Sequence, residues 1–489
     1  MLDKNTSTGD LKMIRPRHQH GLGPDFENLV RSQLKLDDNW LIAASGIEEI
    51  EHKTQREGIE VVEKKTVAYC HIEASDKFKD EACAAARCPG CGGKMCRRGY
   101  RELRAWQHLS VLGQVFEIRA KMVRLECVEC GQYSSQQAPW ESPSKHFTIA
   151  LDEVVIKQVI ESGYSGAALM LTMAVSSLHK LISKRVLGAH LKQDWSRVTA
   201  IGVDDYAIGE GHEYLTIFSD IRNKQVLFVA LGRAHDTFKA LLDEGKKHGF
   251  RPANIVYVSM DMGTGYIKGA KLNFPKAAIV FDKFHVIKMA NDKVDQIRRS
   301  ELGKCTAVAR GYLKGNAWIY RKNEVNLTEK ERARFSKIDL NSFWTGKAYQ
   351  ARVSLQAIYA MPNKEEAAIK LKEWIAWVRE LCVDSPSYFS TPMQTLAKTV
   401  ETQTEGILSH WDSKLTTAFH EGMHSAYSAV KRKARGLGFD GMRTLLYLHY
   451  GKLDFGFDLD APLHTTIKIP KTIRLTSVRK AKNAVKEIA

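Results

Sequence analysis

The sequence lacks the features that would place the protein in or across a membrane. It contains no run of about 18 uncharged apolar residues, which is roughly the length that a transmembrane helix needs. Its first residues also lack the charged stretch followed by an apolar stretch that marks a secretory signal. We therefore expect a cytoplasmic protein with no membrane partner. Disulfides are rare in that compartment, so we expect cysteines that occur in pairs to bind metal.

Acidic residues are scarce relative to basic ones. The chain of 489 residues has 73 Lys and Arg against 56 Asp and Glu, which gives a formal net charge of +17. Residues 466–489 alone carry seven Lys or Arg and one Glu. A surface this basic predicts a polyanionic partner, most often nucleic acid, although a merely basic housekeeping enzyme would share the composition. The length is too great for a single hydrophobic core and suggests three or four domains.

Four of the nine cysteines form two Cys-x-x-Cys pairs. Cys88 and Cys91 make the first pair, Cys127 and Cys130 make the second, and a glycine follows each. Such a turn points two thiolates inward, and the glycine lets backbone amides approach the sulfurs. Together the pairs predict a zinc ribbon with one structural Zn²⁺, and an iron–sulfur centre is the alternative. Cys96 is near enough to substitute, but its spacing fits less well.

Three amphipathic segments follow the cysteine pairs. Residues 146–162, 165–172 and 176–186 have the apolar spacing of helices, and the middle one is short. This pattern is typical of a helix-turn-helix, although an ordinary three-helix unit would share it. We expect Ser176 to cap the third helix. The exposed face of that helix would meet a DNA groove with four side chains: Ser177, His179, Lys180 and Lys184.

Residues 195–289 alternate strands and helices. We predict, in order, strands at 198–206, 212–218 and 225–231, a helix at 235–247, a strand at 254–260, a helix near 265–273, a strand at 277–281 and a further helix. The order βββαβαβα is that of an α/β ribonuclease H-like fold. Asp204 lies on the first strand and Asp261 ends the fourth. Two carboxylates that a sheet brings together can hold a divalent metal ion.

The rest of the chain is mostly helical. Capping patterns at Thr328 and Asn363 and an amphipathic segment at 365–381 predict a helical insertion. A long helix is predicted from residue 413 to 435. Its spacing places one acid and then polar and basic groups on one face: Glu421, His424, Ser428, Lys431 and Arg435. Such a helix would bring a carboxylate to a metal ion and cations to a phosphate backbone.

Four motifs stand in the order found in bacterial insertion-sequence transposases: Ile201-Gly-Val-Asp-Asp-Tyr, Val258-Ser-Met-Asp, Phe281-Asp-Lys-Phe-His-Val-Ile-Lys and His420-Glu-Gly-Met-His-Ser. With the zinc ribbon and helix-turn-helix before them, the chain resembles the ISL-three type from about residue 38 to 450. The resemblance implies a DDE transposase whose catalytic and metal-binding residues are Asp204, Asp261 and Glu421. The family often has Asn where this chain has His424. The choice of Asp204 over Asp205 rests on the motif alone.

The resemblance also implies the reaction and the partners. Such enzymes use two Mg²⁺ (or Mn²⁺) ions to cleave DNA at the element ends and to join the freed 3′-OH to target DNA. The expected partners are double-stranded DNA, as terminal repeats and as target, and further copies of the chain in a homodimer or higher homo-oligomer. The expected location is the bacterial nucleoid. The alternatives are a ribonuclease H-like nuclease or resolvase that does not join strands, and a DNA-binding regulator derived from a transposase.

Two residues of the third motif admit two interpretations each. Asp282 is expected to cap the following helix rather than to bind metal. Lys288 is a candidate DNA contact, although a solvated basic face would contain it equally well.

These features predict seven parts in the chain. They are an N-terminal arm (1–37), a zinc-ribbon β module (38–140), a helix-turn-helix domain (145–192), the first part of the ribonuclease H-like core (195–289), a helical insertion (290–405), the catalytic helix of the core (406–450) and a basic tail (451–489).

Overall fold

The computed structural model of the chain describes residues 23–56, 59–111, 113–207, 214–233, 235–413, 415, 422–423, 425, 428–429 and 437–459. The chain divides into two compact units. The first unit consists of two segments, Met1–Arg185 and Asp454–Ala489. The second unit is the segment between them, Val186–Leu453. None of the described helices combines the length and the apolar character that spanning a bilayer requires.

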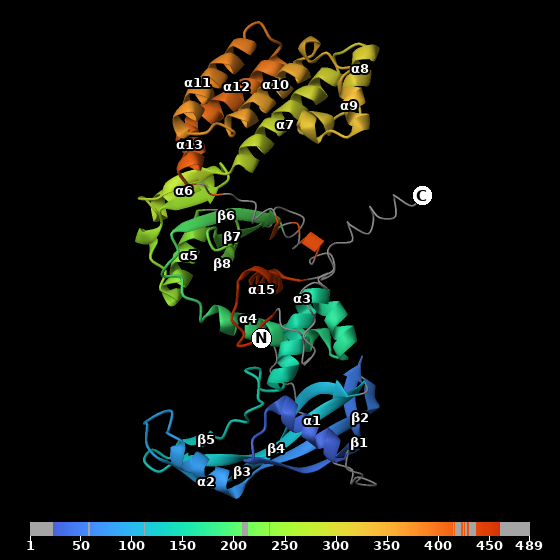
Figure 1. Cartoon of the computed structure of the whole chain (residues 1–489), viewed down its shortest axis with the longest axis vertical. Coiled ribbons are helices and arrows are strands. Elements are labelled where there is room, and N and C mark those ends of the chain that lie inside the picture. Colours follow the sequence, from blue (N-terminus) through green and yellow to red (C-terminus); the bar gives the residue numbers. More distant parts are fainter. Residues whose placement is uncertain are drawn as a thin grey trace. The chain divides into compact units, whose positions relative to one another are not determined.

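The first unit contains a five-stranded sheet (Figure 1). Its strands are β1 (Trp40–Arg56), β2 (Ile59–Ala74), β3 (Met95–Val111), β4 (Gln114–Cys127) and β5 (Tyr133–Ser135). The order is β1-β2-β4-β3 with β5 on β4, and only β2 and β4 are parallel. Helices α1 (Pro24–Leu34) and α2 (Asp76–Ala85) accompany the sheet. Its core is aromatic, since the Trp140 ring packs edge-on against Trp40 and Trp106 at 5.0 and 5.7 Å.

Two helices follow this sheet, α3 (Ile149–Leu171) and α4 (Val175–His190). The predicted break between the first two helical segments is present as a kink inside α3. Gly163 has φ 70° there, a conformation that glycine adopts without steric cost. The prediction that Ser176 caps the last helix is wrong. Helix α4 begins one residue earlier, and the Ala174 carbonyl accepts the Leu178 N–H, so Ser176 lies inside the first turn.

The second unit is built on another five-stranded sheet, of order β10-β9-β6-β7-β8. Its strands are β6 (Ala200–Ala207), β7 (Tyr214–Asp220), β8 (Gln225–Leu231), β9 (Tyr257–Met260) and β10 (Ala278–Phe281). Strands β6, β7 and β8 form an antiparallel meander, and β9 and β10 run parallel to β6. The parallel strands are reached through crossover helices, α5 (Asp236–Gly245) with the short η1 (Lys246–His248), and α6 (Thr264–Asn273). The predicted order of elements is therefore confirmed, with strand boundaries shifted by a few residues.

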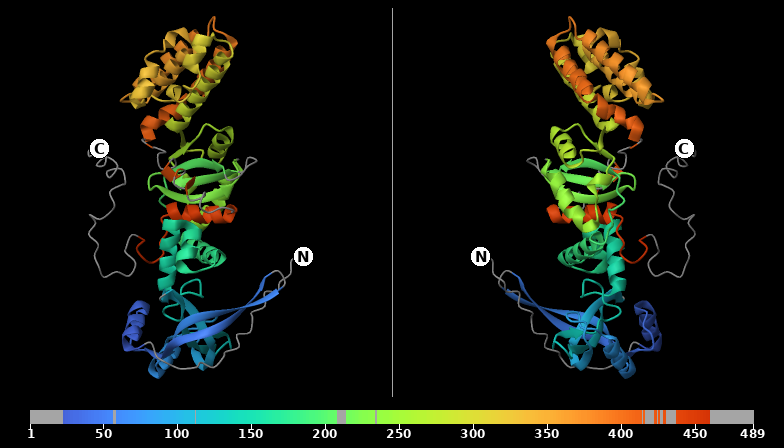
Figure 2. Two further views of the ribbon diagram at one scale, coloured as in Figure 1. Left: turned by 90° about the vertical axis from the view of Figure 1, so that its right-hand side faces the viewer. Right: turned by 90° about the vertical axis from the view of Figure 1, so that its left-hand side faces the viewer.

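Long-range contacts protect the outer strand β8. Helix α15 (Phe439–Tyr450) packs against β8 and lies along the sheet in both views of Figure 2. The Val229 N–H donates to the Tyr447 hydroxyl at 3.3 Å, and Nε2 of His190 donates to the Leu227 carbonyl at 2.7 Å. These bonds occupy two backbone groups of β8 that an edge strand could otherwise offer to another chain.

A helical insertion leaves the sheet through α7 (Lys283–Leu302) and returns through α13 (Thr404–Ser413) (Figure 1). Between them lie α8 (Ala307–Leu313), α9 (Glu329–Phe335), α10 (Trp344–Ile358), α11 (Lys364–Leu381) and α12 (Ser387–Thr402). The predicted capping box is confirmed, because Thr328 and Glu331 bond reciprocally at the start of α9. Helix α13 returns close to β10, since a Cβ on Gly406 would lie 2.4 Å from the Phe281 ring.

Glu301 joins two helices of this insertion. It is 5% exposed at the end of α7 and accepts the backbone N–H groups of Trp344 and Thr345 and the Thr345 hydroxyl, at 2.9, 2.8 and 2.6 Å. A buried carboxylate from one helix thus satisfies the free donors at the start of α10 and complements that helix dipole.

We expect Glu301→Ala to lower the free energy of unfolding by about 1–3 kcal/mol, because it leaves buried donors without an acceptor. Denaturant titration of the full chain measures this loss. The matched control is Glu380→Ala, at an exposed position on α11. Equal midpoints for the two variants would contradict the role assigned to Glu301.

Candidate functional site

The parallel strands bring three aspartates to one level at the carboxyl edge of the sheet. Ser259 on β9 lies opposite Gly202 on β6 and Val280 on β10. Two residues further along each strand come Asp204, Asp261 and Asp282. Because side chains alternate with a period of two, this register directs the three carboxylates to the same face.

Local hydrogen bonds hold each of these carboxylates. Oδ1 of Asp204 accepts the Asp205 N–H at 2.8 Å, and Oδ1 of Asp261 accepts the Gly263 N–H at 2.8 Å. The cap predicted at Asp282 is confirmed, since its Oδ1 accepts the Phe284 N–H at the start of α7. Each aspartate is thereby anchored through one of its oxygens.

Arg233 stands between two of the acids. Its Nε lies 3.1 Å from Oδ2 of Asp205, and its Nη2 lies 3.4 Å from Oδ2 of Asp261. Asp204 instead has the imidazole of His285 beside it, with Nε2 3.9 Å from Oδ1. That same Nε2 is 3.8 Å from Oδ2 of Asp282. Asp204 and Asp205 therefore have different surroundings, although both lie near Asp261.

The electrostatics of this edge favour a bound cation. Burial raises the pKa of Asp204 to about 7, and the neighbouring carboxylates of Asp205, Asp282 and Asp261 add to the rise. Burial also raises the pKa of Asp205, which the charge of Arg233 partly offsets. Clustered, desolvated carboxylates ionise readily only beside positive charge. Hard oxygen ligands of this kind are the ones that Mg²⁺ prefers, so Asp204 and Asp261 fit a divalent metal ion.

The two aspartates do not complete a metal site within the described part of the chain. No third acid or histidine there joins them in a group whose ligand atoms all lie within 4.8 Å of one another. The third predicted carboxylate, Glu421, lies outside the described residues, as do His424, Lys431 and Arg435. Ser428 is described, and its hydroxyl pairs with that of Tyr206 at 2.9 Å, two residues beyond Asp204.

A pocket of about 330 Å³ opens beside Asp261. Besides this acid, it is lined by Met262, Gly263, His285, Lys288, Met289, Asp292 and Lys293. The predicted DNA contact Lys288 is therefore next to the acids rather than on a remote face. Two lysines and an imidazole around such a hollow can balance the charge of a phosphate group.

Sequence reasoning missed Arg233, and it did not predict that Asp282 lies beside Asp204. Arg233 comes directly after Gly232, just beyond β8, and no motif marks it; only the meander folds it back onto Asp205 and Asp261. The position of Asp282 could have been expected, because it follows β10 as Asp261 follows β9. Parallel strands bring such positions to one edge.

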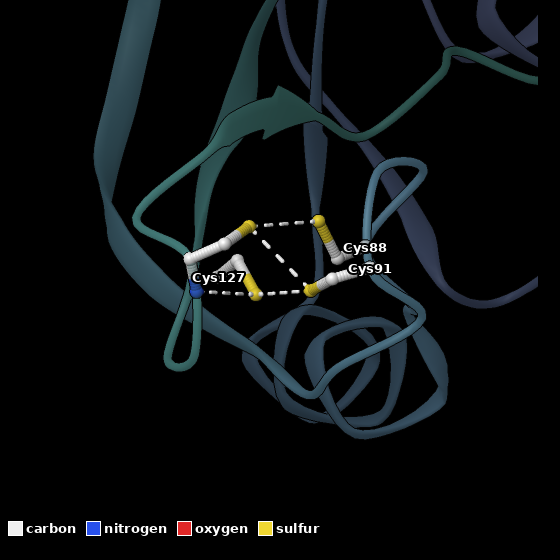
Figure 3. A group of neighbouring side chains, drawn as sticks. Cys88, Cys91 and Cys127 are labelled. Carbon is white, nitrogen blue, oxygen red and sulfur yellow. Dashed lines mark hydrogen bonds between the residues drawn. The ribbon is translucent and has the colours of Figure 1, made fainter.

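The four paired cysteines form a second cluster, in the first unit (Figure 3). Sγ of Cys88 is 3.5 Å from Sγ of Cys130, and Sγ of Cys91 is 3.4 Å from Sγ of Cys127. One ligand atom of each lies within 4.8 Å of all the others. The backbone N–H groups of Cys91 and Gly90 hold the pKa of the Cys88 thiol below its usual range. A tetrahedral ion at roughly 2.3 Å from each sulfur fits this set, which could bind zinc.

The predicted groove-facing residues on α4 differ in exposure. Lys180 and Lys184 are exposed, and Ser177 is half-buried. His179 is half-buried because its ring stacks on Tyr164 at 3.7 Å, and burial lowers its pKa. The lysines are therefore free to reach a phosphate, whereas His179 also packs between α4 and α3.

Comparison with known proteins shows the family of the chain. Residues 201–446 match the family model of ISL3-type DDE transposases, which is described as a transposase. The chain is 22% identical to the transposase for insertion sequence element IS1001 of Bordetella parapertussis, over 71% of this chain and 84% of that protein. It is also 22% identical to the transposase for IS1557 of Mycobacterium tuberculosis, over 62% and 73%. The chain belongs to the ISL3-type family of insertion-sequence transposases.

Proposed function

We propose that this transposase binds the terminal inverted repeats of its element, cleaves DNA at the element ends and joins the resulting 3′-OH ends to target DNA. The observation that carries the proposal is that Asp204 on β6 and Asp261, directly after the adjacent parallel strand β9, meet at one edge of the sheet beside a pocket lined by lysines. The strand order, with a meander followed by two parallel strands, supports a ribonuclease H-like core.

In this proposal Asp204, Asp261 and Glu421 are the catalytic ligands. When bound there, two Mg²⁺ or Mn²⁺ ions would activate the attacking oxygen and stabilise the leaving oxygen of an in-line displacement. Ser428 supports the inclusion of Glu421, because it follows Glu421 by seven residues and contacts Tyr206 at the end of β6. Arg233, paired with Asp205, keeps that carboxylate oriented beside the site.

The two chemical steps share one geometry. In the first, a water oxygen attacks the phosphorus at the element end, the bond from phosphorus to the 3′ oxygen breaks, and a 3′-OH is released. In the second, that 3′ oxygen attacks a target phosphorus and displaces the target 3′ oxygen. Lys288 and Lys293 would balance phosphate charge during both steps, and His285 is near enough to Asp204 to orient it.

The first unit would recognise the element. We propose that the four cysteines hold one structural Zn²⁺ in a zinc ribbon, and that the kinked α3 and α4 act as a helix-turn-helix on double-stranded DNA. The remaining proposed contacts along the phosphate backbone are His424, Ser428, Lys431 and Arg435. The same proposal has three further parts. The chain assembles as a homodimer or higher homo-oligomer on DNA, it associates with the nucleoid, and it is divided into the seven domains predicted from the sequence.

Substitution of the proposed ligands tests the catalytic assignment. We expect Asp204→Asn, Asp261→Asn and Glu421→Gln each to lower cleavage of an element-end duplex in Mg²⁺ by about 100-fold or more, because each removes a charged metal ligand. Binding to the same duplex in a gel-shift assay should persist. Asp243→Asn, an exposed acid on α5 paired with Lys246, is the matched control.

Asp205→Asn decides between the adjacent acids. Full cleavage by Asp204→Asn together with loss in Asp205→Asn would move the role to Asp205. If wild-type protein cuts element ends and never joins them to a target plasmid, the nuclease alternative replaces strand transfer.

The cysteine cluster is tested by metal analysis. We expect Cys88→Ser to lose one zinc per chain relative to wild type and to become sensitive to proteolysis in the first unit, because folding of such a module is coupled to its metal. Cys305→Ser, at a half-buried cysteine in the insertion, should keep the wild-type zinc content. Iron in place of zinc would favour the iron–sulfur alternative.

The role of α4 is tested by salt dependence. Replacement of Lys180 and Lys184 by Ala should weaken binding to any duplex and reduce the slope of log K against log salt by about two, since each phosphate contact contributes roughly 0.9. Lys370 and Lys372, exposed on α11, provide a matched double replacement that should leave the slope unchanged. An unaltered slope in the α4 variant would remove this helix from the DNA interface.

A further inference from the structure

A cluster of two histidines and a glutamate lies in the second unit, away from the motifs that define the family. His190 ends α4, Glu244 lies on α5 and His248 ends η1. One ligand atom from each lies within 4.8 Å of the others. Both imidazoles are buried, with 3% exposure each.

Backbone carbonyls determine which nitrogen of each imidazole carries the proton. Nδ1 of His248 donates to the Gln193 carbonyl at 3.1 Å, so Nε2 has the lone pair when the ring is neutral. Nε2 of His190 donates to the Leu227 carbonyl at 2.7 Å, which leaves Nδ1 with its lone pair. Histidines that ligate a metal usually have their other ring nitrogen held in this way.

The unusual feature of this cluster is the ring nitrogen Nε2 of His248. It is buried and has no hydrogen-bond partner, and Oε1 of Glu244 lies 3.6 Å from it. A lone pair facing a carboxylate oxygen in a buried site is repulsive unless a positive charge lies between them. Two ligands at roughly 2.0–2.2 Å from a tetrahedral zinc ion would be about 3.4 Å apart, which matches this spacing.

Aromatic packing keeps the ligands in position. The Trp195 ring stacks on His248 at 3.9 Å and 14°, and the Tyr447 ring stacks on His190 at 4.1 Å and 21°. The other oxygen of Glu244 is paired with Nζ of Lys247 at 2.7 Å. The site is therefore preorganised on three elements, and its rings have little freedom to rotate.

The charge state also suits a metal ligand set. Burial lowers the pKa of His190 to about 4, so its imidazole is neutral at physiological pH. Burial by itself would raise the pKa of Glu244, but the hydrogen bond and charge of Lys247 bring it below the usual range, so the carboxylate is ionised. The positive charge of the nearby Arg443 disfavours a metal cation at this site. However, Arg443 is paired with Asp440 at 2.8 Å, which offsets part of that charge.

We propose that His190, Glu244 and His248 bind a divalent transition-metal ion, with zinc as the best match to two imidazoles and one carboxylate. The ion ties the last turn of α4 to α5 and η1, behind the edge strand β8. It is a structural site, separate from the carboxylates of the sheet edge and from the four cysteines. The proposal does not rest on the proposed function, since it concerns the free protein.

Zinc content of the purified full chain, measured after dialysis against zinc and then buffer, is the primary test. We expect two zinc ions per wild-type chain, one in His248→Gln and one in Cys88→Ser. His235→Gln, at a half-exposed histidine near the start of α5, should keep two. Equal zinc content in wild type and His248→Gln would overturn the proposal, and the alternative of a protonated His248 paired with Glu244 would replace it.

A second variant tests the site independently, in case His248→Gln does not fold. Glu244→Gln has almost the same shape and lies at a position with 22% side-chain exposure, so it should fold. We expect its zinc affinity at this site to fall at least tenfold and the zinc-dependent rise in Tm to shrink, with unchanged circular dichroism. Cobalt substitution in Cys88→Ser should give a spectrum of nitrogen and oxygen ligands without a thiolate charge-transfer band. An unaltered affinity in Glu244→Gln, or no cobalt bound in Cys88→Ser, would contradict the site.

Discussion

The pairing register of three parallel strands is the constraint on which the second unit of this protein depends. Gly202, Ser259 and Val280 are level across the sheet, so the aspartates that follow two residues later come to the same edge. A shift of one residue in any strand would turn its aspartate to the opposite face. The crossover helices α5 and α6 connect these strands, and they pack against each other. The desolvation that raises the pKa of Asp204 follows from the same packing.

The remaining structure balances the charge that this register concentrates. Arg233 neutralises Asp205 and Asp261 from one side, and Lys288 and Lys293 line the pocket beside them. Asp282 serves two purposes, because it caps α7 and also adds negative charge near Asp204. The insertion leaves and returns at the same edge, where Gly406 on α13 permits close contact with Phe281. A long helical body can thus be inserted into the core without disturbing the strands that hold the acids.

The three candidate metal sites differ in how far local sequence defines them. The cysteine cluster consists of two short turns, each of which is already a half-site. The aspartates become neighbours only when strands separated by more than 50 residues pair. The His190, Glu244 and His248 group needs the end of α4 to meet a crossover helix, and backbone carbonyls from two further segments then set the protonation of its rings.

The sequence by itself determined the elements whose causes are local. The two cysteine turns, the capping box at Thr328, the cap at Asp282 and the order of strands and helices in the second unit follow from turn chemistry and hydrophobic period. It also carried the motifs that place the chain in its family. The start of α4 was mispredicted at Ser176, because a capping hydroxyl competes with a helix that begins just as well at the preceding residue.

Only the tertiary structure decided which residues from distant segments became neighbours. Arg233 lies between Asp205 and Asp261 because the β-meander folds it back, and no motif surrounds it. His179 stacks on Tyr164, so a residue on a presumed outer face is partly a packing residue. The buried nitrogen of His248 faces Glu244 because η1 continues from α5 directly under Trp195. Such contacts depend on the summed packing of the whole unit, and local propensity carries no record of them.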